Sequence, residues 1–119
     1  MLTGKQNPIP ATAIGVVDVR DVAAAYVQSI KVDAAKGHRI ITQNESAWRI
    51  DMAKIIAEEF GPKGWPVCTT EGPKTDDTQS KVDDHPFRNI LGLSYRPLKE
   101  TLIDMCNSMI ESGFAKKPE

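Results

Sequence analysis

The sequence has little cysteine, no excess of either charge and no long apolar run. Cys68 and Cys106 are far apart and lack the spacing of metal ligands, so we expect two reduced thiols. A net charge of −1 and a pI near 6.1 give no electrostatic reason to expect nucleic acid or an anionic membrane as a partner. No run approaches the ~18 apolar residues of a membrane span, and no signal-peptide core is present at the N-terminus. We therefore expect a cytoplasmic protein, with an organellar one as the open alternative.

Motifs that hold a dinucleotide or a nucleotide phosphate are also missing. No G-x-G-x-x-G follows a strand, and no G-x-x-x-x-G-K-[ST] occurs. The chain therefore has no phosphate-cradling loop of either common type, and we expect no cofactor to be bound by this chain alone.

Candidate catalytic and metal-binding residues are few. Cys68 and His85 could meet in space as a nucleophile and base, but nothing in their sequence context favours this. Four aspartates near His85 could form a metal site, although a solvated loop in which Asp83 or Asp84 caps the next helix is the favoured interpretation. The two other acids of this cluster are Asp76 and Asp77. We assign no catalytic residue and no metal ligand.

The stretch from Ala13 to Lys31 joins a strand pattern to a helix pattern. It opens with apolar, β-branched residues, the composition of a strand buried on both faces. From Asp18, a suitable N-cap, the period changes to that of a helix ending near Ile30 or Val32. The apolar stripe of this helix consists of Val19, Val22, Ala23, Tyr26, Val27 and Ile30. A buried strand that leads directly into a helix is half of a βαβ unit and predicts an α/β fold.

Two further segments continue this alternation. Residues 38–43, HRIITQ, form the second predicted strand, and residues 47–60 form a helix that Asn44 or Ser46 caps and Gly61-Pro62 ends. Residues 64–70 are a weaker extended segment, because Pro66 confines it to an edge or a strand start.

The remainder is expected to be a polar loop followed by two helices. Residues 71–84 form the loop, Pro86 begins a short helix that Gly92 ends, and Pro97 begins a long helix that Gly113 closes. The sequence thus predicts strand–helix–strand–helix followed by two helices.

The positions of three side chains, Arg20, Tyr26 and Trp48, predict their contacts. Arg20 lies between Asp18 and Asp21, so we expect local ion pairs or a contact with a partner surface. Tyr26 and Trp48 lie on apolar helix faces and are expected to pack in the core.

At 119 residues the chain is one domain or part of one. Two clear strands are too few for a doubly wound sheet, which usually has five or more. Because both strands have the composition of buried strands, their neighbours are expected to come from self-association or from another portion of a larger fold.

Four segments in order resemble the extended short-chain dehydrogenase/reductases of the NAD(P)-dependent epimerase/dehydratase superfamily. VVDVRDVAAAYV at 16–27 is similar to the family's strand that ends in V-x-V-x-D-V-A and leads into a helix. GHRIITQNES at 37–46 resembles its G-x-R-(Y/F)-I strand, and WRIDMAKIIAEEFG at 48–61 the helix that follows. NILGLSYRPLKETLIDMCNSMIESG at 89–113 is similar to its closing segment. The resemblance implies a partial Rossmann-type fold in which residues 1–119 are a single, C-terminal substrate-domain-like segment.

Within that superfamily the chain is most similar to the dihydroflavonol-reductase and cinnamoyl-CoA-reductase branch. Nucleotide-sugar enzymes commonly place an arginine shortly before the V-x-V, where this chain has Ile14 and Gly15. A phosphate-bearing substrate is therefore not implied.

The resemblance covers only the last third or so of the family's length. The dinucleotide loop, the catalytic Ser and the Y-x-x-x-K pair lie upstream in those enzymes. Tyr95 and Lys99 formally read Y-x-x-x-K, but Pro97 marks a helix start between them, whereas the family's pair lies within one helix. No catalytic residue is carried over.

What the resemblance implies is a carbonyl reductase that uses NADP when complete and that this chain alone cannot reconstitute. Residues expected to line the substrate cleft are Pro8, Ile9, Pro10, Asn44, Ser46 and Trp48. The expected partner is an N-terminal nucleotide-binding half, another protein chain or a second copy. A non-catalytic structural or assembly subunit with a reductase-like fold, and a truncated chain with no independent role, are the alternatives.

Overall fold

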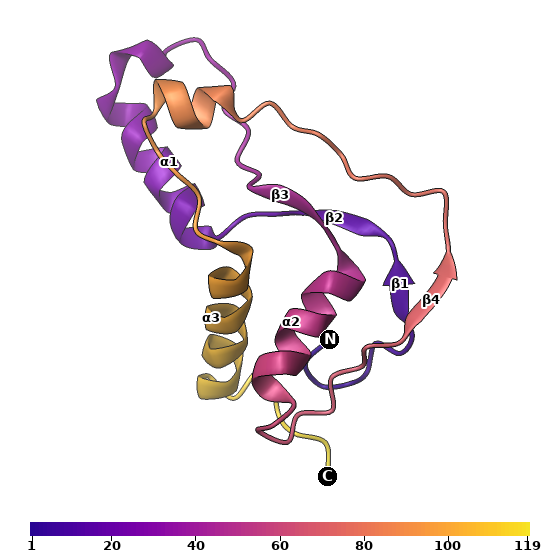
Figure 1. Cartoon of the computed structure of the whole chain (residues 1–119). Helices are drawn as coiled ribbons and strands as arrows, with labels where there is room; N and C mark the ends of the chain where they lie inside the picture. Colours follow the sequence, from indigo (N-terminus) through magenta and orange to yellow (C-terminus); the bar gives the residue numbers. More distant parts are fainter.

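The computed structural model describes residues 1–119, a mixed α/β chain with three helices of more than ten residues. These are α1 (Val19–Lys31), α2 (Arg49–Phe60) and α3 (Leu98–Glu111). Two short helical segments, η1 (Asp33–Ala35) and η2 (Pro86–Ile90), lie close to α1 (Figure 1). None of the helices combines the length and the apolar character needed to cross a bilayer.

The four strands form two separate two-stranded sheets. β2 (Ala13–Val16) pairs antiparallel with β3 (Glu45–Trp48), so that Ala13 lies opposite Trp48 and Val16 opposite Glu45. β1 (Ile9–Ala11) pairs in parallel with β4 (Glu71–Lys74), with an irregularity in the register. The β2–β3 ladder brings the start of α1 and the start of α2 out of the same small sheet, α1 from the end of β2 and α2 from the end of β3 (Figure 1).

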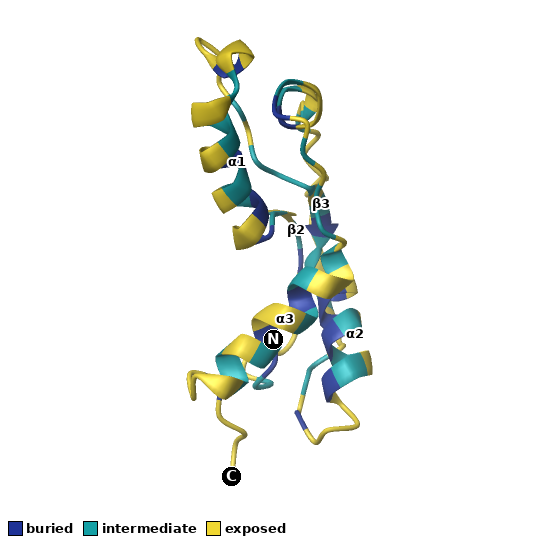
Figure 2. Ribbon diagram, turned by 90° about the vertical axis from the view of Figure 1, so that its left-hand side faces the viewer, coloured by how far each residue is buried: buried dark blue, intermediate teal, exposed yellow.

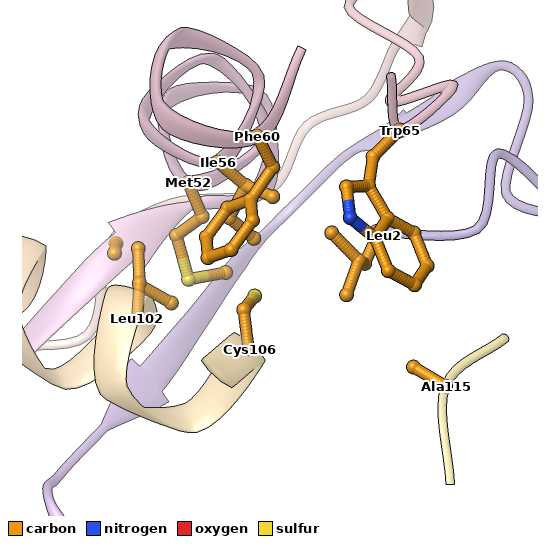
Figure 3. Close-up of a cluster of buried hydrophobic side chains, with 9 residues drawn as sticks. Leu2, Met52, Ile56, Phe60, Trp65, Leu102, Cys106 and Ala115 are labelled. Carbon is orange, nitrogen blue, oxygen red and sulfur yellow. The ribbon is translucent and has the colours of Figure 1, made fainter. Parts of the chain in front are cut away.

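The main core lies between α2 and α3. Met52, Ile56 and Phe60 of α2 point toward Leu102 and Cys106 of α3, as Figure 3 shows. The rest of this cluster is Leu2, Ala47, Trp65 and Ala115. Apolar residues three and four apart on each helix make this packing possible, because they share one face.

A second, smaller core lies at the other end of the molecule, between α1 and η2. Phe87 is fully buried there with Ala25, Ala35 and Leu91. The ring of Tyr95 stacks on Phe87 with 3.9 Å between centroids. A third cluster, Ile9 with Ile50 and Ala53, joins β1 to α2.

The molecule is extended and thin for its length. Its extents are 53 × 37 × 18 Å and its radius of gyration is 16.7 Å, whereas a compact domain of this length has about 13.5 Å. Its accessible surface is 7618 Å², about 1,200 Å² above the value of about 6,400 Å² expected for a folded monomer of this mass. Figure 2 shows how much of each helix remains exposed.

Several predictions from the sequence are confirmed. Asp18 is the N-cap of α1, and its side chain accepts a hydrogen bond from the backbone N–H of Arg20. α1 and α2 end where expected, and α3 begins directly after Pro97. Pro86 begins η2, and Gly113 follows the last turn of α3 with a φ of 73°.

The predicted second strand is wrong. Residues 38–43 form no strand, and β3 lies just after them at Glu45–Trp48. The reason is that β2 pairs with residues 45–48, so residues 38–43 have no neighbouring strand in this chain. Because residues 45–48 pair with β2, α2 begins only at Arg49. Trp48 is at its N-cap position, so Asn44 and Ser46 do not cap it.

The third extended segment is also displaced. Residues 64–70 are not assigned to a strand, and β4 instead occupies residues 71–74 at the start of the predicted polar loop. Backbone hydrogen bonding to β1 selects this position, although Gly72 and Pro73 have low strand propensity.

The prediction that Tyr26 packs in the core is wrong, and Trp48 is only partly buried. Tyr26 is 74% exposed, as Val19, Val27 and Ile30 of the same stripe are exposed. β2 is likewise not buried on both faces. The apolar pattern is present, but no element of this chain covers it.

Candidate functional site

The start of α1 carries a dense polar junction between α1 and α3. The carboxylate of Asp18, which is 5% exposed, accepts hydrogen bonds from the backbone N–H and the guanidinium of Arg20 at 2.8–2.9 Å. It also accepts one from the hydroxyl of Thr101 in α3 at 2.9 Å. Arg20 extends further, to Asp104 of α3 at 2.9 Å. The local ion pair expected for Arg20 is confirmed.

These contacts determine the charge state of the junction. The hydrogen bonds from the Arg20 guanidinium hold the pKa of Asp18 well below its usual range, and they outweigh burial, which acts to raise it. The same partners, Asp18 and Asp104, raise the pKa of Arg20. Both groups therefore stay charged and hydrogen-bonded, which makes them positioning groups and not proton donors or acceptors.

A second ion pair lies one turn further along α1. The buried Asp21 accepts a hydrogen bond from the backbone N–H of Arg96 at 2.9 Å and pairs with its guanidinium. The carbonyl of Arg96 in turn accepts a hydrogen bond from the side chain of Asn44 at 3.0 Å. Sequence reasoning did not anticipate this pair or the Thr101 contact, because no local pattern links residues 75 or more positions apart.

An open groove of about 460 Å³ lies beside this junction. Val17, Val19, Met105 and Met109 supply its apolar walls, and the Arg20 junction supplies its polar end. The groove suits an apolar side chain or ring. Thr101, Ser108 and Asp104 also line it, and no His or Cys is among its lining residues.

Of the predicted cleft residues of the N-terminal loop, only Ile9 belongs to the core of this chain, whereas Pro8 and Pro10 are exposed. Pro8 follows a cis peptide bond with Asn7, and Ile9 is fully buried with Ile50 and Ala53. Pro10 is exposed next to it. That these residues line a substrate cleft stays a prediction.

The predicted residues after position 43 point to different neighbours. Ser46 binds the polar loop, since its Oγ accepts a hydrogen bond from the N–H of Ser80 at 3.2 Å. Trp48 packs against the cluster around Ile9 and lines a shallow groove of about 300 Å³ beside β4. Trp48 and Ile9 are therefore brought together, whereas Asn44 lies with Arg96.

The residues of this chain do not fit a dinucleotide. A pyrophosphate binds at a helix N-terminus that is free of negative charge and approached through glycines. Each of the three long helices instead has a carboxylate in its first turn, Asp21 in α1, Asp51 in α2 and Glu100 in α3. Tyr95 lies outside any helix, so it does not form a helical Y-x-x-x-K pair with Lys99.

The cysteines and the acidic loop show no catalytic or metal-binding arrangement. Both thiols are free, as expected; burial in the main core raises the pKa of Cys106, and Cys68 is hydrogen-bonded to Asn7. Asp83 accepts a hydrogen bond from the backbone N–H of His85, but His85 is the N-cap position of η2 and η2 has no side-chain cap, so the prediction that Asp83 or Asp84 caps this helix is wrong. No three His, Cys, Asp or Glu side chains lie close enough to hold a metal ion.

Comparison with known proteins connects this fold to reductases. No family model matches the chain. It is 29% identical over 109 residues to the NADPH-dependent methylglyoxal reductase GRE2 of Saccharomyces cerevisiae, covering 89% of this chain and 32% of that protein. It is 28% identical over 123 residues to cinnamoyl-CoA reductase 2 of Arabidopsis thaliana, covering 99% of this chain and 35% of that protein.

Comparison with solved structures also connects this fold to reductases. Gre2 from Candida albicans superposes with a TM-score of 0.74 at 26% identity, over 90% of this chain and 33% of that chain. The chain therefore spans about a third of the length of the relatives that it matches. By sequence and by fold it is related to the extended short-chain dehydrogenase/reductases, and the match is consistent with a C-terminal portion of such an enzyme.

Proposed function

We propose that this chain is the substrate-side portion of an NADP-dependent carbonyl reductase and acts only together with a nucleotide-binding portion. Two of its relatives are a methylglyoxal reductase and a cinnamoyl-CoA reductase, and the first is NADPH-dependent by name. The chain itself has no phosphate loop and an acid in the first turn of each long helix. Cofactor and catalytic groups must then come from the other portion.

The observation that carries this proposal is the uncovered surface. The excess of about 1,200 Å² over a compact monomer is larger than the roughly 800 Å² that each partner buries in a standard interface. Its apolar part includes the face of α1, where Tyr26 and Ile30 are 74% and 87% exposed. A nucleotide-binding portion packed on this face would bury it.

In the assembled enzyme the role of this chain is to shape the substrate cleft. Pro8 and Pro10, exposed on either side of the buried Ile9, would form one wall, and Asn44, Ser46 and Trp48 the other. The β2–β3 ladder holds these two segments in a fixed relation, because it ends with Ala13 opposite Trp48. A small ketone or aldehyde is the proposed substrate class, and the cytoplasm is the proposed location.

The test is to purify the tagged chain from its source cells and to identify the chains that co-purify by mass spectrometry. We expect a chain with a G-x-x-G-x-x-G loop and a Y-x-x-x-K pair. The complex should oxidise NADPH in the presence of methylglyoxal or a cinnamoyl thioester, and the 119-residue chain alone should not. NADPH oxidation by the chain alone, or a complex that holds NADPH and reduces no carbonyl compound, would contradict the proposal.

A non-catalytic assembly subunit is the second candidate. The observation that favours it is the state of Asp18, whose two carboxylate oxygens are both occupied by structural hydrogen bonds from Arg20 and Thr101. A co-purifying chain that has no Y-x-x-x-K pair would support this candidate over the first.

A further inference from the structure

The polar segment of residues 75–80 contacts both small sheets without belonging to either. It leaves the end of β4 and leads toward η2 (Figure 1). None of its residues donates or accepts a backbone–backbone hydrogen bond. Its contacts with the two sheets are instead hydrogen bonds in which at least one partner is a side chain. Because the segment is exposed throughout, these hydrogen bonds hold it in place, and burial does not.

One end of the segment binds the turn between β1 and β2. The hydroxyl of Thr75 donates a hydrogen bond to the carbonyl of Ala11 at 2.8 Å. The carboxylate of Asp77 accepts a hydrogen bond from the backbone N–H of Ala13 at 2.7 Å. Residues 8–10, the first wall of the proposed cleft, come directly before this turn. Thr75 and Asp77 therefore fix the backbone at the end of the first wall.

The other end of the segment binds the second wall. The carbonyl of Ser46 in β3 accepts a hydrogen bond from the side chain of Gln79 at 2.7 Å, and its Oγ accepts one from the backbone N–H of Ser80 at 3.2 Å. The side chain of Gln43 donates a longer hydrogen bond to the hydroxyl of Ser80, at 3.4 Å. Since Ser46 is a residue of the second proposed wall, one short segment binds both walls.

These contacts connect two sheets that are otherwise weakly joined at this place. β1 and β4 form one sheet, β2 and β3 form the other, and Thr12 alone links β1 to β2 along the chain. The β2–β3 ladder does not extend to residues 8–10. Packing of Ile9 against α2 holds the buried side of the first wall. The separation of its exposed side from Ser46 then depends on segment 75–80.

We propose that Asp77 is a positioning residue for the carbonyl substrate, because it holds the first wall of the cleft at a fixed separation from Ser46. This inference rests on the proposed function and adds a role for segment 75–80. Asp77 acts through the backbone of Ala13. When this hydrogen bond is lost, the first wall is less constrained and the cleft binds the substrate less tightly. The lost binding is common to the ground state and the transition state, so KM should rise while kcat is kept.

The experiment compares variants of the chain in the complex with the nucleotide-binding chain that co-purifies. The substrate is methylglyoxal or a cinnamoyl thioester, whichever the wild-type complex reduces. Asp77→Ala should raise the KM for this carbonyl compound by about fivefold or more, since it removes a hydrogen bond to a charged acceptor. The kcat and the KM for NADPH should stay within about twofold of the wild-type values.

Two further variants separate the hydrogen bond from the charge. Asp77→Asn should restore a KM within about twofold of wild type, because its amide oxygen can still accept from the N–H of Ala13. Asp76→Ala is the matched control and should leave the KM unchanged. It removes the same charge from the adjacent exposed residue, whose carboxylate makes no hydrogen bond.

Amide exchange measured by NMR on the same complexes tests the hydrogen bond itself. The amide of Ala13 should exchange at least about fivefold faster in Asp77→Ala than in wild type or Asp76→Ala. The inference is overturned if this exchange is unchanged, if Asp77→Ala has the same KM as Asp76→Ala, or if Asp77→Asn is no closer to wild type than Asp77→Ala. An equal rise in the KM for NADPH would also overturn it, because the effect would then not be confined to the substrate cleft. A wild-type complex that reduces neither carbonyl compound contradicts the proposed function, and this inference with it, so the wild-type activity distinguishes the two failures.

Discussion

Replacing Asp18 by alanine tests whether the junction at the start of α1 holds α1 and α3 together. The substitution removes the N-cap bond to the N–H of Arg20, typically about 1 kcal/mol. It also removes the hydrogen bond from Thr101 to a charged acceptor, about 1.5–3 kcal/mol. Relief of the desolvation of a buried carboxylate offsets about 1 kcal/mol of this loss. We expect Asp18→Ala to lower the free energy of unfolding by about 1.5–3 kcal/mol.

The assay is urea unfolding followed by far-ultraviolet circular dichroism, with amide exchange in the first turn of α1 as a local measure. Arg20→Ala is the matched comparison and should cost less. Its side chain is 43% exposed, and the Asp18 carboxylate would keep the backbone N–H of residue 20 and the Thr101 hydroxyl. If Arg20→Ala proved the more damaging of the two, the carboxylate would not be the centre of the junction.

The pH dependence of the free energy of unfolding tests whether the charge of Asp18 stabilises the fold. Because the pKa of Asp18 is lowered in the folded chain, its carboxylate stabilises the fold at every pH above its ordinary value of about 4. The stabilisation is lost as the pH falls below about 4 toward the folded pKa. The difference between wild type and Asp18→Asn should thus be constant from pH 7 to about pH 4 and should shrink below it. A difference that vanished already near pH 6 would point to another titrating group.

Three further predictions concern the chain as a whole. Titration calorimetry of the purified chain should detect binding of neither NADP nor NAD, since no phosphate loop is present, and micromolar binding would contradict this. The isolated chain should dimerise, aggregate or bind a hydrophobic dye until a complementary chain is added; light scattering from a monodisperse, dye-negative monomer would contradict this. Phe87→Ala should cost about 3–5 kcal/mol and speed amide exchange in α1 more than in α3, because Phe87 lies in the core beneath α1, and equal effects on the two helices would be evidence against a separate core.

The helices were predictable because their signals are local. Asp18 caps α1, Gly61 follows the last residue of α2, and Pro97 precedes α3. Each of these residues acts within one turn of its own helix, so the local sequence is sufficient to predict where the helix begins or ends.

The candidate site was much less predictable, because its contacts are long-range. The carboxylate of Asp18 was read as a cap, which it is, but its bond to Thr101 joins residues 83 positions apart. Asn44 was expected to line a cleft as a loop residue, and its amide instead binds the backbone of Arg96. These hydrogen-bond partners depend on how α1 and α3 pack together, and no local sequence pattern predicts that packing.

The predictions for residues 38–43 and for the apolar face of α1 were wrong for a different reason. A strand exists only when a neighbour accepts its hydrogen bonds, and an apolar helix face is buried only when another layer covers it. The composition around Ile40 and Ile41 and the stripe that contains Tyr26 both specify burial, yet Ile41 is 42% exposed and Tyr26 74% exposed. The two patterns meet at one place, because Tyr26 of α1 and Ile40 line the same groove. Local physics supports both sequence patterns and this chain alone does not satisfy them, which is why the proposed function gives the chain a partner portion.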